Sequence, residues 1–187
     1  MAGSERVDAA RNRAAILAAA EDLFSREDAA KVSMSDIAEA AGVGKGTVFR
    51  RFGDRTALIH AILAPRSNEL RRKVEHGPPP LGPGGPPLES LYAYLDALLE
   101  FVWANRSLIH ALEDRGARAY YDTPSSQYWI NELARRLTAA HPGRTDSEYL
   151  AHILYTALRA DVVDYLVSTR GMHLDCIRDN MRKLVTP

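Results

Sequence analysis

Apolar positions in the amino-terminal part of the chain recur at the spacing of α-helices. A stripe of apolar side chains over residues 10–26 predicts a first helix. The sequence SMSD at residues 33–36 resembles a capping box in which aspartate takes the place of the usual glutamate. The Ser33 hydroxyl can accept a hydrogen bond from the amide of Asp36, while the Asp36 carboxylate reaches back to the start of the helix. This box predicts the start of a short second helix.

A glycine turn follows the second helix. Gly42 is placed to end that helix at about Ala41, because glycine commonly follows the last helical residue. A third helix should then begin near Gly44 and reach Phe52. Two short helices joined by a turn of about three to four residues that contains glycine form a helix-turn-helix motif.

A fourth helix and a connector complete this part of the chain. Asp54 can cap the fourth helix. Pro65 in its middle predicts a kink or a restart, because proline removes a backbone hydrogen bond. The sequence GPPPLGPGGPP at residues 77–87 predicts a connector between helices, since all its residues except Leu81 are proline or glycine.

Helical spacing of apolar residues continues after the connector. It predicts helical segments over residues 88–112 and between the prolines at positions 124 and 142. A helix over residues 147–168 is the longest, and its apolar character on nearly every face indicates burial on more than one side. A last helix should run over residues 174–185. Because no run of alternating polar and apolar residues predicts a strand, the fold class is all-α.

Composition narrows the class of protein without deciding its function. The 187 residues carry a formal net charge of zero, with 46% hydrophobic and 26% charged residues. This describes a folded globular chain without an overall positive field, so nucleic-acid binding would have to come from a local cluster of cations. The single cysteine, Cys176, fits a reducing compartment. Because the sequence has no leader and no apolar run of about 20 residues, we expect a cytoplasmic protein with no membrane partner.

Glycine, lysine and arginine are concentrated in the sequence AAGVGKGTVFRRFGDR at residues 40–55. One interpretation is a P-loop that holds the phosphates of a nucleotide. That motif requires a preceding strand, glycine at position 39 and serine or threonine at position 46, where this chain has a helix, Glu39 and Gly46. The other interpretation is DNA binding, because the third predicted helix exposes cationic and hydroxyl side chains that can bond phosphates and base edges.

The sequence SMSDIAEAAGVGKGTVFRRFGDRTAL, together with the helix before it, resembles the DNA-binding head of the TetR (tetracycline-repressor) family of bacterial transcription regulators. The resemblance covers residues 10–60 and rests on an isoleucine–alanine pair, alanine–glycine–valine, lysine–glycine–threonine and a phenylalanine before the fourth helix. It implies a three-helix head with a helix-turn-helix, whose third helix, residues 44–50, enters the major groove.

The predicted DNA contacts follow from this resemblance. Gly44, Phe49 and Arg51 depart from the family pattern, in which serine, tyrosine and histidine are common at these positions. Arg55 takes the position of a phosphate-binding lysine. The permanent charge of Arg51 can compensate for the missing tyrosine hydroxyl. The residues predicted to contact DNA are Ser33, Gly44, Lys45, Thr47, Phe49, Arg50, Arg51 and Arg55.

The resemblance also implies a helical-bundle body that binds a small molecule and forms a homodimer through its last two long helices. The predicted domains are a DNA-binding domain over residues 1–55 and a ligand-binding and dimerisation domain over residues 56–187. Aromatic side chains with polar tips suit an apolar pocket, although ordinary core packing explains any one of them. The predicted ligand-binding residues are Leu95, Leu99, Trp103, His110, Tyr121, Tyr128, Trp129 and Tyr155. The predicted dimer interface is Leu150, Leu154, Leu158, Val162, Leu174, Ile177 and Met181.

Two acidic residues, Asp161 and Asp164, interrupt the apolar helix predicted over residues 147–168. A buried carboxylate requires a partner, because an unpaired charge in an apolar environment is costly. The partner could be an arginine of the same body, an arginine of another subunit or a cationic ligand.

The sequence therefore predicts a homodimeric, ligand-responsive transcriptional regulator, a repressor that a small-molecule effector releases from a palindromic operator in double-stranded DNA. No cofactor or metal is expected, because the histidines and the cysteine of the body lack metal-ligand spacing. One alternative is an architectural DNA binder that responds to no ligand. Another is a helical enzyme tethered to DNA by its head, although residues 88–187 show no nucleophile–base or metal constellation. A monomer with one deeply buried helix is a third.

Overall fold

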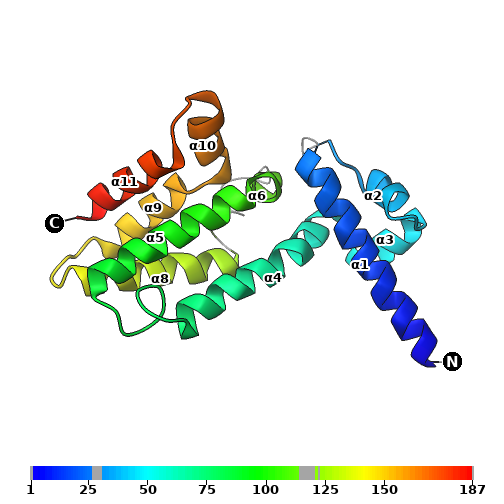
Figure 1. Ribbon diagram of the computed structural model, residues 1–187, viewed down its shortest axis with the longest axis horizontal. Coiled ribbons are helices and arrows are strands. Elements are labelled where there is room, and N and C mark those ends of the chain that lie inside the picture. The colour runs from blue at the N-terminus through cyan, green and yellow to red at the C-terminus, as the bar shows by residue number, and fades with distance from the viewer. Residues whose placement is uncertain (1, 27–30, 114–120, 122, 187) are drawn as a thin grey trace. The chain divides into compact units, whose positions relative to one another are not determined.

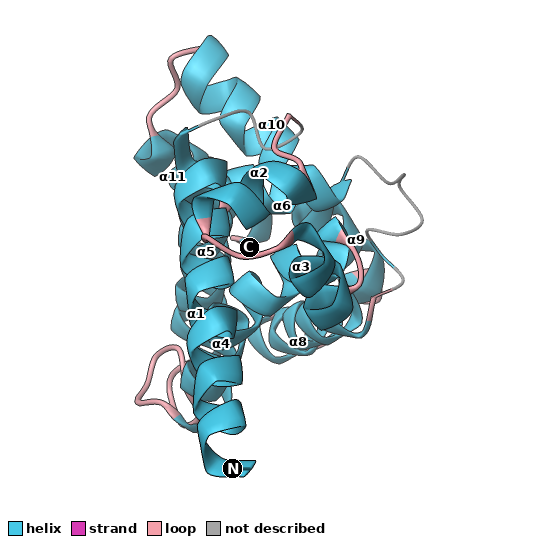
Figure 2. Ribbon diagram, turned by 90° about the vertical axis from the view of Figure 1, so that its right-hand side faces the viewer, coloured by secondary structure: helices cyan, strands magenta, loops and turns pink. Residues whose placement is uncertain are grey.

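The structure, a computed structural model, describes residues 2–26, 31–113, 121 and 123–186. These residues form helices and connecting loops, and no strand occurs among them (Figures 1 and 2), so the predicted all-α fold is confirmed. The chain divides into two compact units, residues 1–67 and residues 68–187. We call the first unit the head and the second the body.

The head is built from three helices and the first part of a fourth. They are α1 (Ala2–Arg26), α2 (Met34–Ala40), α3 (Lys45–Phe52) and α4 (Arg55–His76). α2 contacts both α1 and α3, and together α2 and α3 form the helix-turn-helix. Apolar side chains from all four helices are removed from solvent and make up one core: Ile16, Ala20, Phe24, Ile37, Ala38, Val48, Leu58, Ile59 and Ile62.

Local sequence signals set the helix ends in the head. The Ser33 hydroxyl accepts hydrogen bonds of 3.2 Å from the amides of Ser35 and Asp36, and the Ser33 amide donates to the Asp36 carboxylate at 2.8 Å. The predicted capping box is thus confirmed. Gly42 has a φ of +64°, a left-handed conformation that favours glycine and forms the turn before α3. Asp54 accepts from the amide three residues later at 2.8 Å and so caps α4.

α4 runs through Pro65 as one helix, so the predicted restart does not occur, while the alternative of a kink stays a prediction. The turns on both sides of the proline are held by burial, which offsets the one hydrogen bond that proline removes. Leu58 and Ile62 pack into the head, whereas Leu70 and Val74 belong to the core cluster of the body. The division between the two units therefore falls inside α4, later than the boundary predicted between residues 55 and 56. The functional division into those two domains stays a prediction.

The body is a bundle in which α8 contacts both α5 and α9, while α11 contacts α5 and α10 contacts α6. Its core combines apolar side chains from these helices, and Leu91, Leu99, Leu133, Leu137 and Leu154 are fully buried. The elements are α5 (Pro87–Ala104), α6 (Arg106–Glu113), α8 (Pro124–Ala140), α9 (Ser147–Ala157), α10 (Ala160–Asp164), a π-helical turn (Tyr165–Thr169) and α11 (Leu174–Val185).

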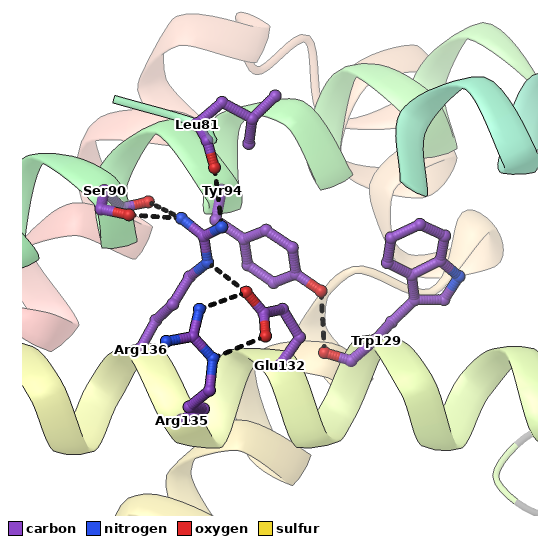
Figure 3. A network of polar contacts seen from close by, with 7 residues as sticks. All are labelled: Leu81, Ser90, Tyr94, Trp129, Glu132, Arg135 and Arg136. Carbon is purple, nitrogen blue, oxygen red and sulfur yellow. Dashed lines mark hydrogen bonds and ion pairs between the residues drawn. The ribbon is translucent and has the colours of Figure 1, made fainter. Parts of the chain in front are cut away.

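The proline- and glycine-rich connector is tied to the body by one buried arginine. The Arg136 side chain on α8 is 3% exposed, and its guanidinium donates to the Leu81 carbonyl at 2.7 Å, the Ser90 carbonyl at 2.9 Å and the Glu132 carboxylate at 2.8 Å. Figure 3 shows these bonds, together with one to the Ser90 hydroxyl. Since Leu81 lies in the connector and Ser90 in α5, Arg136 fixes the path of the chain between α4 and α5.

The helix predicted over residues 147–168 is broken in the structure. α9 ends at Ala157, Arg159 has extended backbone angles (φ −57°, ψ 141°), and α10 begins at Ala160. The carboxylate of Glu113, which ends α6, accepts hydrogen bonds from the first two amides of α10. The prediction of one continuous helix was wrong because this partner lies far away in the sequence.

Candidate nucleic-acid interface

α3 has one apolar face and one polar face. Val48 is fully buried and Phe52 is 9% exposed. Because these two side chains are four residues apart, they lie on the same side of the helix and fix it against the head core. Lys45, Arg50 and Arg51 are exposed on the rest of its surface. The head therefore presents a short helix with cations facing solvent.

The exposed arginines of α3 keep their charge available. Within the described part of the chain, neither Arg50 nor Arg51 forms an ion pair. An unpaired guanidinium can form charge-assisted, bidentate hydrogen bonds with a phosphate group. Phe49 is 42% exposed between these cations, and the Lys45 ammonium lies 5.9 Å from the centroid of its ring. This surface combines positive charge with an exposed aromatic ring.

The first turn of α3 has no side-chain cap, unlike α2 and α4. Gly44 precedes it with extended backbone angles and offers no capping oxygen. A methyl group added at Gly46 would meet no other atom within 4 Å. The start of α3 is therefore bare backbone whose amides can donate hydrogen bonds to a phosphate oxygen, which the positive end of the helix dipole also attracts.

The other predicted DNA contacts lie beside this surface with partners inside the head. Thr47 is half-buried on α3. The Ser33 hydroxyl caps α2, and the half-buried Arg55 guanidinium at the start of α4 lies 5.5 Å from the centroid of the Phe24 ring. Ser33 and Arg55 thus have structural roles, and their contact with DNA stays a prediction.

Comparison with known proteins agrees with this geometry. Residues 16–62 match the description "Bacterial regulatory proteins, tetR family". An HTH-type transcriptional regulator of Staphylococcus aureus (strain MRSA252) is 39% identical over 72 residues, a match that covers 38% of this chain and 38% of that regulator. The segment 16–62 includes all of α2 and α3. Over this segment the chain is similar to the tetR family of bacterial regulatory proteins.

Similarity to solved structures extends beyond the head. NalD, the secondary repressor of the MexAB-OprM multidrug efflux pump in Pseudomonas aeruginosa, is 22% identical, with a TM-score of 0.60 over 95% of each chain. FadR from Bacillus subtilis, solved in complex with stearoyl-CoA, is 13% identical, with a TM-score of 0.65 over 91% of this chain and 96% of that one. At these identities the likeness shows that the fold is shared.

The predicted ligand-binding residues lie in or against the body core. Leu95, Leu99 and Trp129 are 1%, 0% and 6% exposed. Trp103, Tyr121, Tyr128 and Tyr155 are half-buried and pack against the core cluster, whereas His110 is exposed. Core packing therefore accounts for most of these residues, which is the other explanation that the sequence analysis gave for them.

The body also has an open groove beside the connector. It measures about 460 Å³ and is lined by the connector, the end of α4 and one side of α8. Of the predicted ligand-binding residues only Tyr128 lines it. Burial and the neighbouring Glu75 carboxylate raise the pKa of Tyr128 to about 12, so its hydroxyl stays protonated at neutral pH. The polar lining near Arg135 and Glu132 was not predicted, because it depends on how α8 faces the connector.

The predicted dimer residues fall into two groups. Leu154, Leu158, Ile177 and Met181 are at most 6% exposed and pack into the core of their own chain. Leu150 and Leu174 are half-buried, and Val162 is 37% exposed. Val162 is therefore the most exposed of the seven.

Other large apolar residues of the same helices are exposed instead. Tyr149 and Ile153 on α9 are 70% and 43% exposed, Tyr165 in the π-helical turn is 52% exposed, and Leu184 on α11 is 58% exposed. Tyr149 and Ile153 are four residues apart and share the face of α9 opposite Ala151 and Leu154. This spacing was the signal in the sequence for a second apolar face on α9. The sequence could not tell which of the two apolar faces belongs to the core.

The two aspartates of the last helices have arginine partners in the same body. Arg159 pairs with Asp161 at 2.9 Å, and Arg106 pairs with Asp164 at 3.4 Å. The hydrogen bonds from Arg159 lower the pKa of Asp161. The sequence left open whether the partner is an arginine of the same body, an arginine of another subunit or a cationic ligand. These contacts show an arginine of the same body.

The described part of the chain has neither a metal-binding cluster nor a membrane-spanning helix. No three His, Cys, Asp or Glu side chains among them gather so that they could hold a metal ion. None of the helices that they form is both long enough and apolar enough to cross a bilayer.

Proposed function

We propose that this chain is a homodimeric DNA-binding transcriptional regulator, a repressor that a small molecule releases from a palindromic operator. The observation that carries DNA binding is the surface of α3, where Lys45, Arg50 and Arg51 are exposed beside a bare first turn. The match of residues 16–62 to the tetR family of bacterial regulatory proteins supports the same function. Repression is supported by NalD, a repressor that has this fold.

The geometry of α3 suits the major groove. In helix-turn-helix proteins the second helix of the motif lies in that groove with its first residues against base edges. Lys45 and Thr47 would then reach bases or phosphates, while Arg50 and Arg51 would bind the phosphate backbone. The uncapped amides at the start of α3 would add a further phosphate contact.

The exposed apolar residues of the body support a homodimer. We define the candidate dimer face as Tyr149, Ile153, Val162, Tyr165 and Leu184. Burying apolar side chains of this size against a second copy stabilises association by about 25 cal/mol per Å² of apolar surface. A two-fold dimer would present two α3 helices to half-sites about 34 Å apart, one turn of DNA, and so a palindromic operator.

The proposed effector is a small, largely apolar molecule. FadR, which shares this fold, was solved with stearoyl-CoA, and half-buried Trp103, Tyr121 and Tyr155 pack against the body core. An effector that binds better to one spacing of the two heads would shift the dimer toward that spacing. If that spacing does not match the half-sites, the operator is released.

Selection of bound sequences from a pool of random DNA duplexes tests the proposal. We expect a palindromic consensus and, in sedimentation equilibrium, a mass twice that of the chain. Recovery of no enriched sequence would contradict a regulator with an operator. A consensus whose binding changes with none of a panel of long-chain acyl-CoA thioesters and hydrophobic drugs would favour the ligand-independent binder.

A further inference from the structure

α10 is too short to hold its own position. It contains five residues and continues directly into the π-helical turn of five more, and the residue before it, Arg159, supplies no side-chain cap to its first turn. An isolated helix of this length is unstable in water, because nucleating a helix costs more than a single turn returns. Yet Val162 of the candidate dimer face lies on α10, and Tyr165 follows directly after it. Contacts from elsewhere must therefore place these two side chains.

Glu113 supplies the missing cap from another helix. Its two carboxylate oxygens accept hydrogen bonds from the amides of Ala160 at 2.9 Å and Asp161 at 3.2 Å, which lie 47 and 48 residues away in the sequence. The Arg159 guanidinium lies 3.7 Å from the same carboxylate, and the Glu113 side chain is 1% exposed. A carboxylate at this position satisfies both leading amides of α10 and interacts favourably with the positive end of its dipole.

The opposite ends of α6 and α10 are also joined. Arg106, which begins α6, pairs with Asp164, which ends α10, at 3.4 Å. This second link is weaker, because the two side chains are 41% and 50% exposed and solvent screens their charges. α6 and α10 are thus paired antiparallel, with the buried contact at Glu113.

We propose that Glu113 is a positioning residue for the dimer face: its carboxylate fixes α10 against α6, so that Val162 and Tyr165 meet a second copy of the chain in one arrangement. The inference rests on the dimer that is part of the proposed function. Because the amides of Ala160 and Asp161 find their acceptor on α6, a displacement of α6 carries α10 with it, which connects α6 to the dimer face.

Glu113→Gln in the full-length protein is the direct test. Glutamine keeps the size of the side chain but has one acceptor oxygen for two amides and no charge opposite Arg159. We expect the dimer dissociation constant in sedimentation equilibrium to rise about 10- to 100-fold, the range set by losing a hydrogen bond to a charged group. Amide hydrogen exchange should accelerate at residues 160–165, while the amides of α5 and α8 keep their protection.

Two further variants separate positioning from general loss of stability. Glu100→Gln removes an exposed carboxylate on α5 that is paired with Arg178, and it should leave both measurements unchanged. Glu113→Asp keeps the charge on a shorter side chain. It should fall between the wild type and Glu113→Gln in both measurements, and it also serves as the test if the glutamine variant does not fold.

The outcomes distinguish this inference from the proposed function. A wild-type chain that stays monomeric at all concentrations overturns the dimer and the inference together. If the wild type forms a dimer and both Glu113→Gln and Glu113→Asp keep its dissociation constant, the inference alone is overturned. Faster exchange spread evenly over α5, α8 and α10 would also overturn it, because that pattern means loss of global stability.

Discussion

Helix α3 of the head and the core of the body use arginine in opposite ways. In the head, Arg50 and Arg51 are exposed on α3 and form no ion pair within the described residues. In the body, Arg136 is 3% exposed and donates to a carboxylate and two backbone carbonyls, and Arg159 pairs with two acidic side chains. A formal net charge of zero therefore conceals a local surface where positive charge is available.

The physical environment explains this difference. A buried guanidinium has lost its hydration, so it is stable only when carboxylates and carbonyls satisfy its donors. Arg136 meets that condition, and it joins parts of the body that are distant in sequence. An exposed guanidinium stays hydrated and free to exchange water and counterions for phosphate. The same residue type thus stabilises the fold in the body and is placed to bind a partner in the head.

The largest effect is expected in the body, from Arg136→Ala. Removing this side chain leaves the Glu132 carboxylate and the Leu81 carbonyl without their buried partner, which should lower the free energy of unfolding by about 3 kcal/mol. Urea unfolding followed by circular dichroism measures it. Arg135→Ala is the matched control, because Arg135 pairs with the same Glu132 but is 64% exposed, and it should cost less than about 1 kcal/mol. Equal losses in the two variants would contradict a special role for burial.

A large effect on DNA binding, with little on stability, is expected for the double variant of Arg50→Ala and Arg51→Ala. Removing two unpaired charges should weaken operator binding at least about tenfold at low salt and reduce the slope of log K against log salt by about 2. Fluorescence anisotropy over a salt series measures both. Arg72→Ala serves as the control, because Arg72 is 61% exposed but paired with Glu69. An unchanged salt slope in the double variant would place the DNA surface elsewhere.

A smaller effect is expected at Gly46, where one substitution should stabilise the fold and weaken DNA binding. Gly46→Ala should raise the free energy of unfolding of the head by about 0.5–1 kcal/mol, because alanine is the better helix former and its methyl group meets no atom within 4 Å. The same methyl group would stand between the start of α3 and the DNA backbone, so operator affinity should fall. Thermal unfolding and anisotropy together test this. Tighter binding by the variant would show that DNA does not approach α3 at this residue.

The smallest effect concerns the pH dependence of the head. The hydrogen bond from the Ser33 amide lowers the pKa of Asp36 below its usual 3.8. A carboxyl group whose pKa is lower in the folded state stabilises the protein above the unfolded pKa, and this contribution is lost as the pH falls through the folded pKa. Asp36→Asn should therefore flatten the decline of the melting temperature in acid. Parallel acid profiles for the variant and the wild type would exclude the capping box as a source of that decline.

Much of the head could be predicted from its sequence because its signals are local. The capping box joins residues three apart, Gly42 supplies its own backbone conformation, and the apolar stripe of α3 follows helical spacing. Each of these features depends on neighbours within a few turns. The same local signals placed Lys45, Arg50 and Arg51 on the exposed side of α3.

The body was predicted less well, because long-range contacts decide its details. One apolar run at residues 147–168 became α9, α10 and a π-helical turn, since Glu113 caps α10 from 47 residues away. Periodicity marked both faces of α9 as apolar but could not say that Leu154 faces the core while Ile153 is exposed. The role of Arg136 in holding the connector was likewise not visible in the sequence.

The sequence by itself determined the all-α class, the helix-turn-helix and the cationic face of α3, because caps, turns and helical periodicity act over a few residues. Only the tertiary structure decided where the last helices break, which apolar side chains remain exposed and which arginines are neutralised. Those outcomes depend on burial and on partners brought together from distant parts of the chain. They are also the features on which the proposed dimer face and the role of Glu113 rest.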